Sequence, residues 1–111
     1  MKRENLIAYA ASFVSFLLDE DVARDIGRII LFGSVARGLI DRDSDIDVFV
    51  DTKKDLEREV QKTLILFRQS ESQRKWELKG LKNELSVKTG ELNKWKLRRD
   101  ILSDGILLYG K

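Results

Sequence analysis

Residues 31–50, LFGSVARGLIDRDSDIDVFV, limit the fold of this chain more than any other feature. Two apolar runs, residues 28–32 and 45–50, have the β-branched and aromatic composition of strands, and turn-forming residues lie between them. Because successive side chains of a strand point to opposite faces, Asp45 and Asp47 share one face and the apolar residues around them share the other. The stretch therefore predicts two sheet strands, the second with a pair of carboxylates on one face.

The other predicted elements rest on apolar residues at the spacing of a helix or a strand, often with glycine at the end. They are helices at residues 1–18, 53–74 and 91–105, a short helix at 35–40 capped by Ser34, and strands at 83–90 and 106–110. Strands separated by helices form a mixed sheet with helices packed against it. We therefore expect an α/β (α+β) fold, with residues 1–111 forming a single domain.

The composition narrows the chemistry that the chain can perform. It contains no cysteine and no histidine, which excludes disulfides, thiolate metal sites and nucleophiles activated by histidine. The first 18 residues fall short of the ~20 apolar residues of a membrane span. Acidic residues 19–21 follow them, where a signal peptide would have a small-residue cleavage site. We expect this stretch to pack on the core of a cytoplasmic protein with no membrane partner.

Gly33 and Ser34 form a turn between the first strand and the short helix, and this turn suits a phosphate group. Glycine lets the backbone approach a ligand closely, and free N–H groups at the start of a helix favour an anion. Arg37 adds a guanidinium that forms charge-assisted hydrogen bonds with phosphate oxygens. The Cα atoms of Asp45 and Asp47 lie ~6.5 Å apart, close enough for one Mg²⁺ or for two ions ~4 Å apart. The combination predicts a nucleoside triphosphate site.

A plain strand face, a P-loop and a serine nucleophile each fit these residues less well. An exposed strand face would accommodate two aspartates without a function, but it would not explain the turn at Gly33. GSVARG has the GxxxxG spacing of a P-loop, yet Leu39 and Ile40 follow where lysine and serine or threonine are required. Ser34 is not in a GxSxG elbow, and the chain has no histidine to activate it. We therefore expect Ser34 to bind phosphate and not to act as a nucleophile.

Gly33 and Ser34, ten intervening residues, and then Asp45-Ile46-Asp47 form the pattern GSx10DxD. This pattern resembles the signature of the DNA polymerase β-like nucleotidyltransferase superfamily. FGSVARG and DSDIDVFV are similar to its minimal nucleotidyltransferase (MNT) branch. The leading helix, the long helix after the second strand and the closing ILSDGILLYG resemble the same small proteins. The resemblance covers most of the chain and implies the polymerase β-like nucleotidyltransferase fold.

The resemblance also implies roles for the residues of the pattern. Gly33 and Ser34 would contact the triphosphate of ATP, the expected nucleotide donor, and Arg37 would assist them. Asp45 and Asp47 would bind two Mg²⁺ ions. An acceptor hydroxyl would attack the α-phosphorus in line and release pyrophosphate, which requires positioning and charge compensation but no side-chain nucleophile.

Catalytic members of this superfamily bring a third carboxylate from the next strand of the sheet, flanked by hydrophobic residues. In NELSVKTG the flanked residue is Ser86, which has no carboxylate. Glu84 lies two residues earlier, on the same face by parity, and is the acid that this strand offers as a catalytic residue and metal ligand. Either Glu84 completes the site, or it is a surface glutamate and catalysis is weak or lost.

The resemblance implies a partner as well. In the MNT branch the acceptor is often a tyrosine of a helical HEPN-type toxin, so the protein would be the antitoxin of a toxin-antitoxin pair. A second hypothesis is a non-catalytic protein that neutralises the toxin. A third is a nucleic-acid-modifying transferase, because residues 71–100 hold 9 Lys and Arg against 5 Asp and Glu. We interpret Trp76 and Trp95, which lie among these basic residues, as packing aromatics and not as base-stacking platforms.

Overall fold

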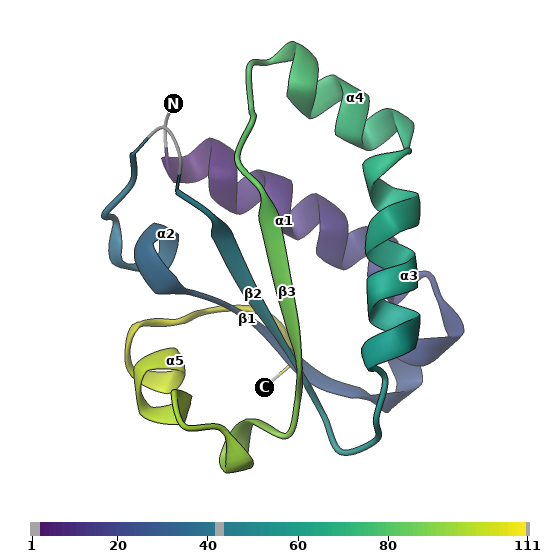
Figure 1. Ribbon diagram of the computed structural model, residues 1–111, viewed down its shortest axis with the longest axis vertical. Helices are drawn as coiled ribbons and strands as arrows, with labels where there is room; N and C mark the ends of the chain where they lie inside the picture. Colours follow the sequence, from purple (N-terminus) through teal and green to yellow (C-terminus); the bar gives the residue numbers. More distant parts are fainter. Residues whose placement is uncertain (1–2, 42–43, 111) are drawn as a thin grey trace.

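The computed structural model describes residues 3–41 and 44–110, and a mixed sheet runs through their centre (Figure 1). Within these residues the sheet has four strands, in the order β3-β2-β1-β4. The strands are β1 (Ile26–Phe32), β2 (Ile46–Thr52), β3 (Leu85–Gly90) and β4 (Ile106–Gly110). β1 is antiparallel to β2 and β4, whereas β2 and β3 run parallel. The expected α/β fold is confirmed.

Helices α1 (Arg3–Leu18) and α3 (Glu57–Arg68) cover one face of the sheet, and Figure 1 shows α1 crossing behind β2 and β3. Their apolar stripes are buried as the helical spacing predicts, and they pack against the alternate residues of β2 that point to this face. The buried residues are Leu6, Ala10, Phe13 and Leu17 of α1, Val60, Leu64 and Phe67 of α3, and Ile46, Val48 and Val50 of β2. In the described part of the chain, no helix is long and apolar enough to cross a membrane.

A smaller core lies on the opposite face of the sheet. Ile30 of β1 and Phe49 of β2 pack there against Leu92 and Ile101. Leu92 belongs to the 3-10 helix η2 (Leu92–Lys94) and Ile101 to α5 (Arg98–Asp104). Because β2 alternates between the two cores, Asp47 points to the same face as Phe49, away from α1 and α3.

The predicted helix at 53–74 is two helices, α3 and α4 (Glu71–Leu78). Ser70 separates them, because its hydroxyl donates to the carbonyl of Phe67 at 2.6 Å and accepts the N–H of Gln73 at 3.3 Å. The first bond satisfies the end of α3 and the second caps the start of α4. The prediction of one long helix was therefore wrong, although its buried stripe was predicted correctly.

The predicted helix at 91–105 is also wrong in extent, since η2 and a turn replace its first half. Trp95 adopts an extended backbone, with φ −85° and ψ 141°. Its ring packs edge-on against Phe49, with the ring centroids 4.7 Å apart. Packing on the second core thus overrides the helical pattern, and only α5 is helical, ending at Gly105 as expected. The 3-10 helix η1 (Asp21–Asp25) connects α1 to β1.

Candidate nucleotide-binding site

Gly33 lies directly against Asp47, so the two halves of the GSx10DxD pattern meet in space. The register of β1 and β2 places Phe32 opposite Asp47, and Gly33 follows with a φ of +77°. A β-carbon at residue 33 would lie 3.2 Å from Cγ of Asp47 and closer still to one of its carboxylate oxygens. Glycine is therefore required at this position both for the left-handed backbone and for space.

The helix that follows the turn differs from the prediction for residues 35–40. α2 (Gly33–Arg37) begins earlier, and its N-cap residue is Phe32, which makes no side-chain cap hydrogen bond. The prediction that Ser34 caps the helix is wrong, since Ser34 lies within the first turn. α2 ends before residue 40 because Gly38 adopts the left-handed conformation, with a φ of +78°. The Ser34 hydroxyl is not used for capping and stays at the turn.

Arg3 of α1 holds α2 in place. Its guanidinium donates to the backbone carbonyls of Val35 at 2.9 Å and of Ala36 at 2.5 Å. The last carbonyls of a helix have no partner within the helix, and a cation at this end also interacts favourably with the helix dipole. The contact fixes the orientation of the short helix that carries Arg37.

Asp47 is half-buried, and its pKa is raised above the ordinary value of an aspartate. Burial is the largest cause and the nearby Asp45 carboxylate is the second, while the charges of Lys88 and Arg37 lower the pKa. A bound cation would stabilise two carboxylates that repel each other in a partly desolvated site. Carboxylate oxygens are the hard ligands that Mg²⁺ prefers. The donor set of Asp45 and Asp47 therefore fits a divalent cation.

The structure brings together five of the six residues predicted for the site. Gly33 and Ser34 lie where β1 passes into α2, and Arg37, in the last turn of α2, is close enough to act electrostatically on Asp47. Asp45, which is exposed, immediately precedes β2 and also acts on Asp47. The turn, the guanidinium and the two carboxylates therefore lie at one end of β1 and β2.

The sixth residue, Glu84, borders this cluster through its backbone, because its carbonyl accepts the N–H of Ile46 at 2.8 Å. Parallel pairing of β2 and β3 places Ser86 beside Asp47. Glu84 precedes β3, is exposed, and also borders a cavity of about 450 Å³ that Tyr9 of α1 lines. Within residues 3–41 and 44–110, no three acidic, histidine or cysteine side chains gather as a metal site. The role of Glu84 as a third ligand stays a prediction.

Lys88 faces the site and was not predicted from the sequence. It lies two residues after Ser86 on the same face of β3, and its charge lowers the pKa of Asp47. The parity argument that selected Glu84, two residues before Ser86, selects Lys88 equally well. A search limited to acidic side chains overlooks it.

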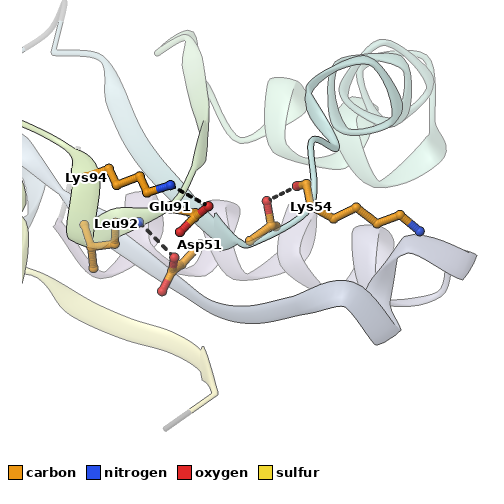
Figure 2. A network of polar contacts seen from close by, with 6 residues as sticks. Asp51, Lys54, Glu91, Leu92 and Lys94 are labelled. Atoms are coloured by element: carbon orange, nitrogen blue, oxygen red, sulfur yellow. Dashed lines mark hydrogen bonds and ion pairs between the residues drawn. The ribbon is translucent and has the colours of Figure 1, made fainter.

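Asp51 shares the face of Asp47 but lies at the other end of β2, where it has a structural role. Its carboxylate forms an ion pair with Arg28, with Nε and Oδ2 2.8 Å apart, and accepts the N–H of Leu92 at 2.9 Å. Figure 2 shows the contact with Leu92, which lies beside the ion pair of Glu91 and Lys94. These contacts fix the start of η2 on the sheet.

Trp76 and Trp95 pack at the edges of the two cores, as predicted. Trp76 packs edge-on against Tyr9, with ring centroids 6.0 Å apart, and its indole N–H donates to the Ser12 hydroxyl at 3.2 Å. Trp95 packs edge-on against Phe49. Each large ring therefore contributes to the packing of the domain.

The family model described as "Nucleotidyltransferase domain" matches residues 12–108. The chain belongs to this family. The match includes β1, α2, β2 and β3, and therefore every residue of the site described above. The family membership predicted from GSx10DxD is confirmed.

Two solved structures share the fold of this nucleotidyltransferase domain. One, described as a toxin-antitoxin with AMP-PNP, is 20% identical with a TM-score of 0.57, and the match covers 91% of this chain and 73% of that chain. The other, a protein from Sulfolobus solfataricus proposed to be a nucleotidyltransferase, is 17% identical with a TM-score of 0.54, and the match covers 100% of this chain and 90% of that chain. No curated protein sequence matches this chain. At these identities the similarity shows a shared fold.

Proposed function

We propose that this nucleotidyltransferase domain transfers AMP from ATP to a hydroxyl acceptor with the help of Mg²⁺. The observation that carries the proposal is the close approach of Gly33 to Asp47. It joins a turn that suits phosphate to a pair of carboxylates that suits a cation. A turn alone would bind an anion and carboxylates alone would bind a cation, whereas a nucleoside triphosphate with its metal ion requires both.

Each residue of the site has a part in this reaction. The backbone N–H groups of Gly33 and Ser34, with the Ser34 hydroxyl, would hold the terminal phosphates, and Arg37 would donate charge-assisted hydrogen bonds to them. Asp45 and Asp47 would hold Mg²⁺, which when bound neutralises phosphate charge and favours attack on the α-phosphorus. The residues thereby orient the donor in line with the acceptor hydroxyl. The bond from the acceptor oxygen to the α-phosphorus forms as the bond to pyrophosphate breaks.

The acceptor that we propose is a tyrosine of a helical, HEPN-like toxin, which makes this protein an antitoxin. Support comes from the shared fold with the structure described as a toxin-antitoxin with AMP-PNP, where the match covers 73% of that chain. A tyrosine hydroxyl on a separate chain is also consistent with the compact domain, whose described helices all pack on its own sheet or on each other.

The test is incubation with ATP labelled at the α-phosphorus and Mg²⁺, alone and with the protein encoded beside this one. We expect label on a tyrosine of the partner with the wild type, and loss of the label with Asp45→Asn and with Asp47→Asn. Asp19→Asn, the same change at an exposed residue after α1, should leave the transfer unchanged. Transfer that survives at both Asp45 and Asp47 variants would contradict the site assignment.

Ser86 favours a second candidate function. Because a serine lies beside Asp47 where a third carboxylate is expected, the domain would bind nucleotide and neutralise its partner without transferring AMP. ATP binding that requires Asp45 and Asp47, combined with no label on any offered acceptor, would favour this candidate over the transferase.

A further inference from the structure

The two sides of the carboxylate pair differ in charge. On the side of β1, Asp47 meets the backbone of Gly33 and the turn that suits phosphate. On the side of β3, Asp47 lies beside Ser86, and Lys88 follows on the same face. One side therefore offers backbone and hydroxyl groups, and the other offers a neutral hydroxyl and an ammonium group.

A second divalent cation does not fit the side of β3. Mg²⁺ is bound through carboxylates together with substrate phosphates, and Asp45 and Asp47 supply such a set for one ion. A second ion beside Asp47 would need a further charged donor, but Ser86 is neutral. No third His, Cys, Asp or Glu joins the pair in the part of the chain that the structure describes.

Lys88 brings a fixed positive charge to the same side of the carboxylate pair. Its charge acts on the Asp47 carboxylate, so that the ammonium lies within electrostatic reach of the site. Among the described residues, the ion pairs are Arg28–Asp51, Lys54–Asp25 and Lys94–Glu91, and none of them involves Lys88. An ammonium and a divalent cation repel each other at short range, whereas an ammonium attracts a phosphate oxygen.

We propose that the domain binds a nucleoside triphosphate with a single divalent cation, held by Asp45 and Asp47, and that the Lys88 ammonium supplies the positive charge beside Ser86 in place of a second cation. This inference rests on the nucleotide-binding function proposed above. It reduces the number of bound cations from the two that the resemblance implied to one. It also adds Lys88 as a residue that contacts the triphosphate.

The test counts Mn²⁺ ions bound per molecule of α,β-methylene-ATP, an analogue whose α–β bridge cannot be broken to release pyrophosphate. The protein is kept in excess so that all nucleotide is bound, and free Mn²⁺ is measured by its electron paramagnetic resonance signal. We expect one Mn²⁺ per bound nucleotide for the wild type. The double variant Ser86→Asp, Lys88→Met supplies the missing carboxylate and removes the competing charge, and it should bind two.

The matched control is Ser86→Asn, Lys88→Met, which has nearly the same volume but no new charge and should bind one Mn²⁺. Circular dichroism shows whether each variant is folded. Two Mn²⁺ per nucleotide in the wild type would overturn the inference, and so would one Mn²⁺ in a folded Ser86→Asp, Lys88→Met variant. Equilibrium dialysis of the nucleotide is read separately, so a wild type that binds no nucleotide overturns the proposed function as well.

A second measurement isolates Lys88. Lys88→Met retains the aliphatic stem and removes the charge, and it should weaken binding of α,β-methylene-ATP by roughly tenfold, the effect of losing a hydrogen bond to a charged group. Lys62→Met makes the same change at an exposed residue of α3 and should leave the affinity unchanged. Equal affinities of the two variants would overturn the role of Lys88.

Discussion

The backbone of Gly33 lies so close to the side chain of Asp47 that any β-carbon at residue 33 would overlap the carboxylate. Gly33 directly follows β1 and Asp47 lies in β2, so this contact depends on the register that sets Phe32 opposite Asp47. This contact therefore holds the proposed phosphate-binding turn next to the carboxylates that are proposed to bind the cation.

Gly33→Ala should lower both stability and ATP affinity. A β-carbon in the left-handed conformation costs about 1–2 kcal/mol, and overlap with Asp47 adds to this and displaces the carboxylate. Gly38→Ala is a matched control, because Gly38 has nearly the same φ, +78°, but nothing within 4 Å of the added atom. Urea unfolding and ATP titration should show a backbone effect alone at Gly38. Equal losses of ATP affinity in the two variants would contradict the importance of the contact.

Asp47→Asn should stabilise the protein at neutral pH when nucleotide and metal are absent. The folded protein raises the pKa of Asp47 above its ordinary value of 3.8, so the folded state binds a proton there more tightly than the unfolded chain does. In acid the carboxyl is neutral in both states. As the pH rises through the unfolded and then the folded pKa, ionisation destabilises the folded state, and the full penalty is present at neutral pH.

The free energy of unfolding of Asp47→Asn should therefore exceed that of the wild type at neutral pH by up to about 1 kcal/mol, the scale of partly exposed charges. The difference should disappear as the pH falls below the unfolded pKa. Urea unfolding across this pH range measures it, with Asp19→Asn as the control. A stability gain that persists in acid would show a cause other than the charge of Asp47.

Asp51→Ala should lower stability without affecting the nucleotide site. The substitution removes the partner of Arg28 and the acceptor for the N–H of Leu92, and because these groups are partly buried the loss should cost about 1 kcal/mol. ATP affinity in the folded variant should equal that of the wild type. A large loss of ATP affinity would place Asp51 in the nucleotide site and contradict its purely structural role at the other end of β2.

Ser70→Ala should destabilise α4 in particular. It removes the side-chain oxygen that caps this helix through the N–H of Gln73, an effect of about 1 kcal/mol. Ser15→Ala, at an exposed position of α1, is the control and should have little effect. Hydrogen exchange of the amides of residues 71–78 measures the change locally, and unchanged protection in Ser70→Ala would contradict the capping role.

Much of the fold could be predicted from local patterns. The alternation around Asp47 identified the strand and the face of its side chain, and the spacing of apolar residues identified α1 and the buried stripe of α3. These patterns predict strands and helices correctly because the spacing of apolar residues depends on which face of the element is buried. GSx10DxD predicted a candidate site, and the structure brings the glycine and the aspartate of the two halves of this pattern into contact.

The sequence could not predict features that depend on distant contacts. Trp95 interrupts a helical pattern because it packs against Phe49, a residue from another strand. Lys88 lies on the face of Asp47 because β3 pairs in parallel with β2 and places Ser86 beside Asp47. Strand order and register decide both, and neither is visible in the neighbouring residues of the chain.

Mg²⁺-dependent binding of ATP is the most direct measure of whether the Gly33 turn and the Asp47 carboxylate form one site. Isothermal titration of the wild type, Asp47→Asn and Asp51→Asn, each with Mg²⁺ and with a chelator, compares two aspartates on the same face of the same strand. We expect the wild type and Asp51→Asn to bind ATP only with Mg²⁺ and Asp47→Asn to lose this binding. ATP binding by Asp47→Asn that equals the wild type, with the same dependence on Mg²⁺, would contradict the account.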